Sequence, residues 1–198
     1  RLKDCMDTII EHSQKGFVPK QLITSQTRLT KLVQAYLEET DEEGLIIMLD
    51  LEKAFDRVSH EYLLEAMHRL GFGEEMCDWI GMMYNKDRPA RRRLRINGEV
   101  SEGFTLASGV AQGCPVSALL FLAVTEGFSR LVESDEKLEG ITIRGIVHKI
   151  AQFADDTTMY IRNWAQLPDM WRLVDVWCEC TGMQVNKAKT EGLRAGRP

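Results

Sequence analysis

In the sequence QFADDTTMYI, residues Gln152 to Ile161, two adjacent aspartates interrupt a run of strand-forming residues. The apolar and β-branched residues on either side predict two strands that meet at Ala154-Asp155-Asp156. Aspartate is common in turns, so one interpretation of the pair is a simple hairpin turn. Adjacent carboxylates in apolar surroundings also repel each other and lose hydration unless a cation compensates them. A metal site is therefore the second interpretation, and the two aspartates alone do not decide between them.

A third carboxylate, Asp50, follows the apolar run LIIML from Leu45 to Leu49. The length and composition of this run predict a strand that is buried on both faces. If this strand neighbours the strands around Asp155 and Asp156, the three carboxylates meet at one edge. Carboxylates from two neighbouring strands can hold a pair of divalent ions about 3.5–4 Å apart, the arrangement used for in-line phosphoryl transfer. Oxygen ligands of this kind suit Mg²⁺.

Helices and further strands surround these two segments. The pattern predicts helices over Ser25–Glu39, Ser59–Leu70, Glu74–Tyr84, Val116–Val132 and Leu167–Cys180, a hairpin over Leu94–Leu106, and strands over Ile141–His148 and Lys149–Phe153. Ser59 is placed to cap its helix, and Asn97-Gly98 is a strong signal for the hairpin turn. In the helix over Glu74–Tyr84 we expect Met76, Trp79, Ile80 and Met83 to face inward. Because strands and helices do not alternate regularly, the predicted class is α+β.

The composition is that of a globular protein of 198 residues, 44% hydrophobic and 28% charged. No apolar run approaches the roughly 20 residues that span a bilayer, so we expect no membrane partner. The five cysteines include no CxxC pair, and no histidine lies at ligand spacing, which favours reduced intracellular thiols over a zinc site. The chain begins at Arg1 without a methionine, so we expect a piece of a longer protein.

The net charge of −5 argues mildly against a nucleic-acid-binding protein, but the charge is unevenly distributed. One short stretch contains Arg88, Arg91, Arg92, Arg93 and Arg95. Alternate residues of a strand share a face, so Arg91, Arg93 and Arg95 would lie together and could contact phosphates. The other interpretation is a solvated edge strand whose charges prevent aggregation.

Four segments resemble, in the family's order, successive motifs of the reverse transcriptases of non-LTR (LINE-type) retrotransposons. They are LIIMLDLEKAFDRV (45–58), SGVAQGCPVSALLF (108–121), QFADDTTMY (152–160) and GMQVNKAKTEGL (182–193). A fifth, QKGFVPKQLI (14–23), resembles an earlier motif of the fingers. The resemblance implies a right-hand polymerase palm, a small antiparallel sheet backed by helices, with part of the fingers and no thumb. It implies a partial fingers segment over 1–44 and a palm over 45–198, with a fingers insertion over about 71–107.

The same resemblance implies roles for the acidic residues. Asp50 and Asp155 of the FADD motif would bind two Mg²⁺ or Mn²⁺ ions, with Asp156 as a supporting carboxylate. Lys189 matches a lysine that assists the departure of pyrophosphate, as a general acid or a compensating cation. The alternative for Lys189 is a solvated surface lysine, which we prefer for Lys187.

Further residues match the parts of the family that contact nucleotide and nucleic acid. Phe55 matches the aromatic residue that lies under the sugar and excludes a ribose 2′-hydroxyl, and without the motif it would be read as a core phenylalanine. Gln112 and Gly113 match the segment near the template base and the incoming nucleotide, and they also suit a loop before the helix that Pro115 starts. Gln14 and Gly16 match a segment that we expect to contact nucleic acid.

The implied activity is RNA-directed DNA polymerisation, with an RNA template, a DNA primer or target and dNTPs as partners. The fragment alone would be incomplete, because no thumb follows. The alternatives are a catalytically inactive nucleic-acid-binding remnant of such an element, and a group II maturase-like or RNA-templated polymerase palm. Phe55 favours a deoxynucleotide substrate over a ribonucleotide. Copying from a chromosomal target implies a nuclear location.

Overall fold

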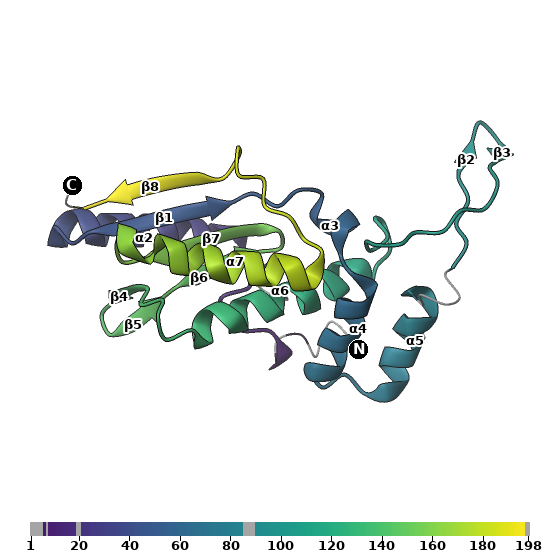
Figure 1. Cartoon of the computed structure of the whole chain (residues 1–198), viewed down its shortest axis with the longest axis horizontal. Coiled ribbons are helices and arrows are strands. Elements are labelled where there is room, and N and C mark those ends of the chain that lie inside the picture. The colour runs from purple at the N-terminus through teal and green to yellow at the C-terminus, as the bar shows by residue number, and fades with distance from the viewer. Residues whose placement is uncertain (1–5, 7, 19–20, 85–89, 197–198) are drawn as a thin grey trace.

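The computed structural model describes residues 6, 8–18, 21–84 and 90–196. Of the residues singled out above, Arg88 and Cys5 lie outside this part of the chain. Figure 1 shows an elongated body with a hairpin that projects at one end. The order of helices and strands is mixed, which confirms the predicted α+β class.

A four-stranded antiparallel sheet forms the centre, in the spatial order β6-β7-β1-β8. The strands are β1 (Gly44–Leu49), β6 (Ile150–Phe153), β7 (Asp156–Ile161) and β8 (Glu191–Ala195). The predicted apolar run at Leu45 to Leu49 is therefore a strand, and it lies beside β7 as the three-carboxylate hypothesis requires.

Helices cover both faces of this sheet (Figure 1). The helix α2 (Ile23–Thr40) packs Val33 and Leu37 against Ile46 and Tyr160 on one face. On the other face, the main core is built by α4 (His60–Arg69), α6 (Ser117–Ser134) and α7 (Leu167–Thr181). Alternate side chains of β1 divide between the faces: Leu45, Ile47 and Leu49 enter the main core, and Ile46 packs under α2.

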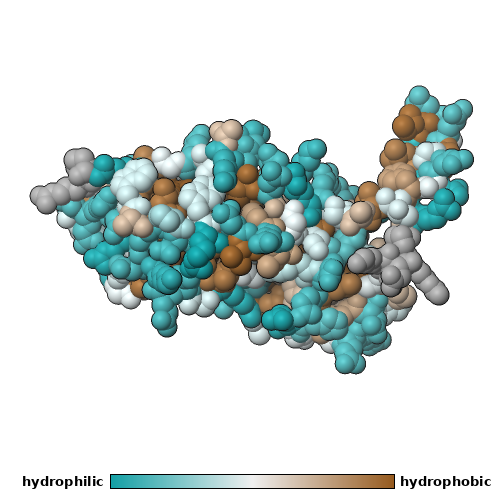
Figure 2. Space-filling model, in the orientation of Figure 1, coloured by the Kyte–Doolittle hydropathy of each residue, from teal (hydrophilic) through white to brown (hydrophobic). Residues whose placement is uncertain are grey.

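The smaller elements lie at the periphery. They are α3 (Ala54–Arg57), α5 (Glu74–Tyr84), β2 (Arg95–Ile96), β3 (Glu99–Val100), β4 (Ile141–Ile143), β5 (Ile146–His148) and the short 3-10 helix η1 (Trp164–Gln166). Figure 2 shows that the β2–β3 hairpin projects from the body and carries apolar residues. Among them, Ile96 is 63% exposed and Leu94 55%.

Two local predictions from the sequence, the Ser59 helix cap and the Asn97-Gly98 turn, are confirmed by the structure. The Ser59 side chain caps α4 by accepting a hydrogen bond from the Tyr62 backbone N–H. Asn97 and Gly98, with φ of 51° and 87°, form the two-residue turn between β2 and β3. Gly182, with a φ of 76°, ends α7 in the left-handed conformation that favours glycine.

Two expectations were wrong. The segment 141–148 is not one strand but a separate hairpin of β4 and β5, because Arg144 and Gly145 both have positive φ and reverse the chain. In α5, Trp79 is 62% exposed and Met83 37%, so these two side chains do not face the core as predicted. The buried stripe consists of Cys77, Ile80 and Tyr84.

None of the helices within the described ranges is long and apolar enough to cross a bilayer.

Candidate active site

The carboxylates of Asp50 and Asp156 belong to facing positions at one end of the sheet. Leu49 of β1 pairs with Thr157 of β7, so the next positions along the two strands are Asp50 and Asp156. Side chains alternate along a strand, so Asp50 follows Ile46 and Met48 onto the face that α2 covers. Met48 is 40% exposed, which shows that α2 leaves this end of the face open. The two carboxylates therefore sit at an accessible end of the sheet.

Asp155 lies in the tight turn between β6 and β7. Phe153 pairs with Asp156, which leaves Ala154 and Asp155 as the two residues of the turn. The turn interpretation of this segment is thus confirmed for Asp155, while Asp156 begins the next strand. Ala154 has a φ of 59°, a left-handed conformation that costs energy for a residue with a Cβ.

Among the residues that the structure describes, no Lys, Arg or His side chain pairs with these three carboxylates. In the described part of the chain, Asp50, Asp155 and Asp156 take part in no salt bridge, although arginines elsewhere pair with other acids, as Arg172 does with Asp135 at 2.6 Å. Within the same ranges, no group of three or more His, Cys, Asp or Glu side chains is arranged so that it could hold a metal ion by itself. The arrangement suits an ion that takes few protein ligands and completes its shell with water or substrate oxygens, as Mg²⁺ does.

Burial and the neighbouring carboxylates both act on the pKa of Asp156. Partial burial raises the pKa of the Asp156 carboxyl above its ordinary value, and the neighbouring charges of Asp155 and Asp50 raise it further. The three side chains therefore interact electrostatically. A divalent cation at this place would lower the cost of keeping all three ionised.

Asp156→Asn is expected to raise the melting temperature of the metal-free protein near neutral pH. Because folding raises the pKa of Asp156, this group favours the folded state below the ordinary aspartate pKa of about 3.9, and that contribution is lost as the pH rises through the folded-state value. The gain from asparagine should therefore shrink as the pH falls toward about 3. Thermal melts in a chelator across this pH range measure it, with Glu136→Gln, an exposed acid beyond the end of α6, as the control. A lower melting temperature for Asp156→Asn at neutral pH would contradict the repulsion.

The loop NKAKT, residues 186–190, forms hydrogen bonds with the Asp50 backbone. The Asn186 N–H donates to the Asp50 carbonyl at 2.8 Å, and the Asp50 N–H donates to Thr190 Oγ1 at 3.4 Å. Lys189 lies exposed within this loop, and its role stays a prediction. Lys187, by contrast, places Nζ 5.3 Å from the centre of the Trp171 ring, in keeping with the surface role preferred for it.

Phe55, five residues after Asp50 in the chain, contacts the loop before α6 and α6 itself. The half-buried Phe55 ring stacks on Phe121 with ring centres 4.5 Å apart and an interplanar angle of 13°. The Phe55 carbonyl accepts a hydrogen bond from the Val110 N–H at 2.8 Å. The Gln112 amide reaches Asp56 Oδ1 at 3.5 Å, and Gly113 is exposed with a φ of 83°. The predicted nucleotide-contacting residues are thus brought together, and the role of each stays a prediction.

Gln14 and Gly16 are not on the surface. Gln14 is only 2% exposed, and Gly16 is also buried. Both lie behind the Ala154–Asp155 turn, with the Gln14 amide hydrogen-bonded to the Ala154 backbone. A buried and fully engaged amide has no group left for nucleic acid, so the structure does not favour the direct contact expected from the sequence. Nothing in the local sequence reveals this burial, because the bonds join residues 140 positions apart.

The predicted phosphate-binding arginines lie at the base of the projecting hairpin. Arg91, Arg93 and Arg95 are all exposed. The regular strand pairing includes only Arg95, although Arg92 forms an isolated bridge with Phe104. Arg91 donates to the Gly103 carbonyl at 3.2 Å. The shared face therefore stays a prediction, since a full ladder does not hold the three side chains in register.

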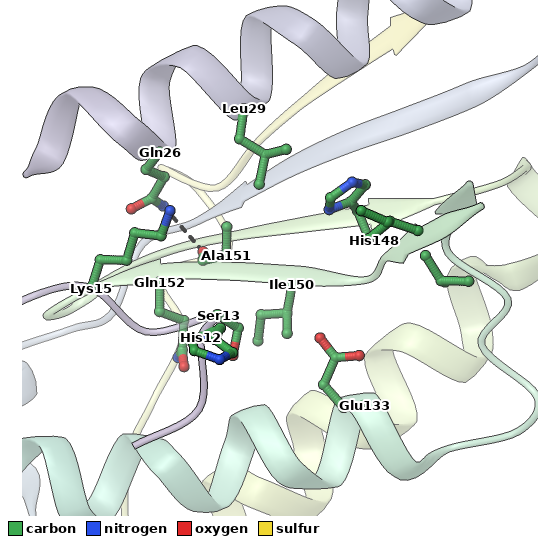
Figure 3. Close-up of a pocket in the computed structure, with 12 residues that line it drawn as sticks. His12, Ser13, Lys15, Gln26, Leu29, Glu133, His148, Ile150, Ala151 and Gln152 are labelled. Atoms are coloured by element: carbon green, nitrogen blue, oxygen red, sulfur yellow. Dashed lines mark hydrogen bonds between the residues drawn. The ribbon is translucent and has the colours of Figure 1, made fainter. Parts of the chain in front are cut away.

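A cavity of about 320 Å³ lies away from the carboxylates, along the outer edge of β6. Figure 3 shows its lining from the N-terminal segment, α2, β6 and the end of α6, with Gln26 hydrogen-bonded to the Ala151 carbonyl. None of the residues that line this cavity is one of the three aspartates.

Known proteins share this sequence and fold. The family described as reverse transcriptase (RNA-dependent DNA polymerase) matches residues 1–196. The uncharacterized 149 kDa protein of transposon TX1 from Xenopus laevis is 26% identical over 99% of this chain, which corresponds to 15% of that protein. The Pol polyprotein of the type-1 retrotransposable element R2 from Nasonia vitripennis is 31% identical over 93% of this chain and 18% of its own length.

Among solved structures, a telomerase from Candida tropicalis, in complex with the TWJ fragment of telomeric RNA, superposes with a TM-score of 0.71. The match covers 98% of this chain and 32% of the telomerase, at 12% sequence identity, and so shows a shared fold. The chain spans less than a fifth of the TX1 and Nasonia R2 proteins. With the family match over nearly every residue, the chain belongs to the reverse transcriptase (RNA-dependent DNA polymerase) family.

Proposed function

We propose that this chain is the polymerase core of an RNA-directed DNA polymerase that extends a primer 3′-hydroxyl on an RNA template. The observation that carries the proposal is the group formed by Asp50, Asp155 and Asp156, three uncompensated carboxylates at the open end of a buried sheet. The carboxylates of such a group repel one another, and a bound cation relieves that repulsion. Phe55 and Gln112 lie beside it, where a nucleotide would be held.

Asp50 and Asp155 would hold two Mg²⁺ or Mn²⁺ ions, with Asp156 beside them. When bound, such a pair of ions stabilises the attacking and leaving oxygens of an in-line displacement. The protein's own contribution is rigid placement: Asp50 is fixed between the NKAKT loop and β7, and Asp155 by the two-residue turn. Lys189, exposed in that loop, would donate a proton to the departing pyrophosphate or offset its charge.

The substrate would be a deoxynucleoside triphosphate. The Phe55 ring is fixed from below by Phe121, so a sugar that lies on its exposed side meets a flat apolar surface. Such a surface leaves no room for a 2′-hydroxyl. Gln112 and Gly113, exposed in the neighbouring loop, would approach the template base and the incoming nucleotide.

The template and primer would lie along the open end of the sheet and reach the exposed Arg91, Arg93 and Arg95. We assign residues 1–44 to the fingers and 45–198 to the palm, with a fingers insertion over about 71–107. The relatives compared above belong to a transposon and a retrotransposable element. For the full protein we propose copying of RNA at a chromosomal DNA target, and therefore a nuclear location.

Primer extension tests the proposal. The full natural protein that contains these residues is incubated with an RNA template, an annealed DNA primer, dNTPs, and Mg²⁺ or Mn²⁺. We expect template-dependent extension that stops when the metal is chelated. Extension with rNTPs in preference to dNTPs would instead indicate an RNA-templated RNA polymerase. The absence of extension, together with the absence of Mn²⁺ and dNTP binding, would identify an inactive nucleic-acid-binding remnant.

A further inference from the structure

The buried side chain of Gln14 forms hydrogen bonds with the backbone of the Ala154–Asp155 turn. Gln14 Oε1 accepts a hydrogen bond from the Ala154 N–H at 3.0 Å, and Gln14 Nε2 donates to the Ala154 carbonyl at 3.3 Å. The side-chain amide therefore satisfies both backbone groups of the residue that immediately precedes Asp155. The same Oε1 accepts from the Gly16 N–H at 2.8 Å, which fixes the orientation of the amide.

The chain around Gln14 is held tightly against the turn. The Lys15 N–H donates to the Gln152 carbonyl at 2.9 Å, and the Gln152 N–H donates to the Ser13 carbonyl at 2.7 Å, so this segment extends the edge of β6. Figure 3 shows Ser13, Lys15 and Gln152 side by side there. A Cβ at Gly16 would lie 2.0 Å from the Ala154 nitrogen, so only glycine permits this approach.

The preceding part of the same N-terminal segment is held against α6 by a buried glutamate, Glu126. Glu126 of α6 is fully buried, and its carboxylate accepts from the Glu11 N–H at 3.1 Å and from Arg130 at 2.7 Å. Arg130 also donates to the Ile9 carbonyl at 2.9 Å. The segment from Ile9 to Gly16 is thus fastened to α6 at one end and to the Ala154 turn at the other.

The turn needs this support for a conformational reason. Ala154 has a φ of 59°, which side chains with a Cβ adopt only when the surroundings impose it. The β6–β7 hairpin has no glycine at this position to relieve the strain. Paired bonds from Gln14 to both Ala154 backbone groups supply the constraint, and Asp155 and Asp156 follow directly in the chain.

We propose that Gln14 is a positioning residue that sets the backbone of the Ala154–Asp155 turn and thereby the orientation of the two aspartates. This inference rests on the proposed function. It replaces the expected contact of Gln14 with nucleic acid by an internal role: loss of Gln14 should impair metal binding and nucleotide addition and leave the affinity for template and primer unchanged.

Gln26 supplies a matched control. It is also a buried glutamine, 8% exposed, and its Nε2 donates to a β6 carbonyl, that of Ala151, at 3.1 Å. Ala151 lies three residues before the turn residue Ala154. Methionine is close to glutamine in size and lacks its hydrogen-bonding groups. Gln14→Met and Gln26→Met therefore each remove hydrogen bonds from a buried amide, to the backbone of Ala154 and of Ala151 respectively.

The test is made in the full natural protein, with primer extension, Mn²⁺ binding by electron paramagnetic resonance, and template–primer binding measured side by side. For Gln14→Met we expect kcat to fall by about 10- to 100-fold, because small misplacements of reacting groups cost factors of this size. Mn²⁺ binding should weaken, and the template–primer Kd should stay within about twofold of wild type. Gln26→Met should keep kcat within about threefold.

Several results would overturn the inference. Wild-type kcat and Mn²⁺ affinity in Gln14→Met would remove the positioning role while leaving the proposed function intact. Equal losses in the two methionine variants, with equal drops in melting temperature, would show a general requirement of the fold. A weakened template–primer Kd with unchanged kcat would restore direct contact with nucleic acid. If wild type fails to extend primers, the proposed function fails and the positioning role falls with it.

Discussion

Asp155→Asn is expected to slow nucleotide addition by about 1,000-fold or more in the full natural protein. Stabilisation of the transition state by metal ions is worth several kcal/mol, and each 1.36 kcal/mol corresponds to a factor of ten in rate. Asparagine keeps the shape of the side chain but removes the charge that binds a cation. Because Asp155 is exposed in a two-residue turn and forms no salt bridge, the fold itself should be unaffected. Single-turnover primer extension measures the rate.

The matched control is Glu136→Gln, which removes one exposed carboxylate far along the chain from the turn. It should leave the rate within about twofold of wild type, since exposed charges at a distance are screened by salt. The melting temperature and the template–primer affinity of Asp155→Asn should match those of wild type. A variant that extends primers at the wild-type rate would remove Asp155 from the catalytic group.

Three of the four strands of the sheet, β1, β6 and β7, were predictable because their sequence signals are local, whereas the edge strand β8 was not predicted. The LIIML run contains no polar residue, which is typical of a buried strand. The charged Asp50 follows it and is only partly buried. Asn97-Gly98 tolerates the two positive φ values that a tight hairpin needs. Each of these signals depends on a few consecutive residues, so a single sequence is enough to reveal it.

The sequence could not predict that Asp50 and Asp156 occupy facing positions. Their placement depends on the register between two strands that are more than 100 residues apart in the chain. A slip of one residue between β1 and β7 would place a different residue opposite Asp50. The sequence shows two adjacent aspartates and does not show which of them faces the third. The structure assigns that place to Asp156 and leaves Asp155 in the turn.

Polarity was also a poor guide to exposure in two places. Gln14 belongs to a polar segment, yet it is buried because its amide replaces the bonds that water would make to Ala154. Trp79 was expected inside because it is large and apolar. It is exposed because α5 contacts the body mainly through α4, and only its Cys77 and Ile80 side reaches the core. The neighbours that decide both cases are distant in sequence.

Phe55→Val is expected to lower the preference for dNTPs over rNTPs by about 10- to 100-fold, the range in which the shape of an apolar pocket discriminates between similar substrates. The Phe55 ring has one side on Phe121, and its backbone carbonyl is held by Val110, so it cannot move aside for a 2′-hydroxyl. Valine keeps an apolar side chain but removes the flat surface. The measured quantity is the ratio of kcat/KM for the two nucleotides on one RNA template. A partial loss of folded protein lowers both values equally and cancels in this ratio.

Phe104→Val, which shortens an exposed aromatic residue of the projecting segment, is the matched control and should leave the ratio unchanged. If Phe55→Val also leaves it unchanged, Phe55 is a packing residue for α6 and the choice of sugar is made elsewhere. If the ratio falls, the stacked pair acts as one unit: Phe121 at the start of α6 fixes the ring, and the ring fixes the sugar. The helix α6 would then also determine which nucleotide reaches the carboxylates. This role explains why Phe55 is only half-buried although its partner Phe121 is fully buried.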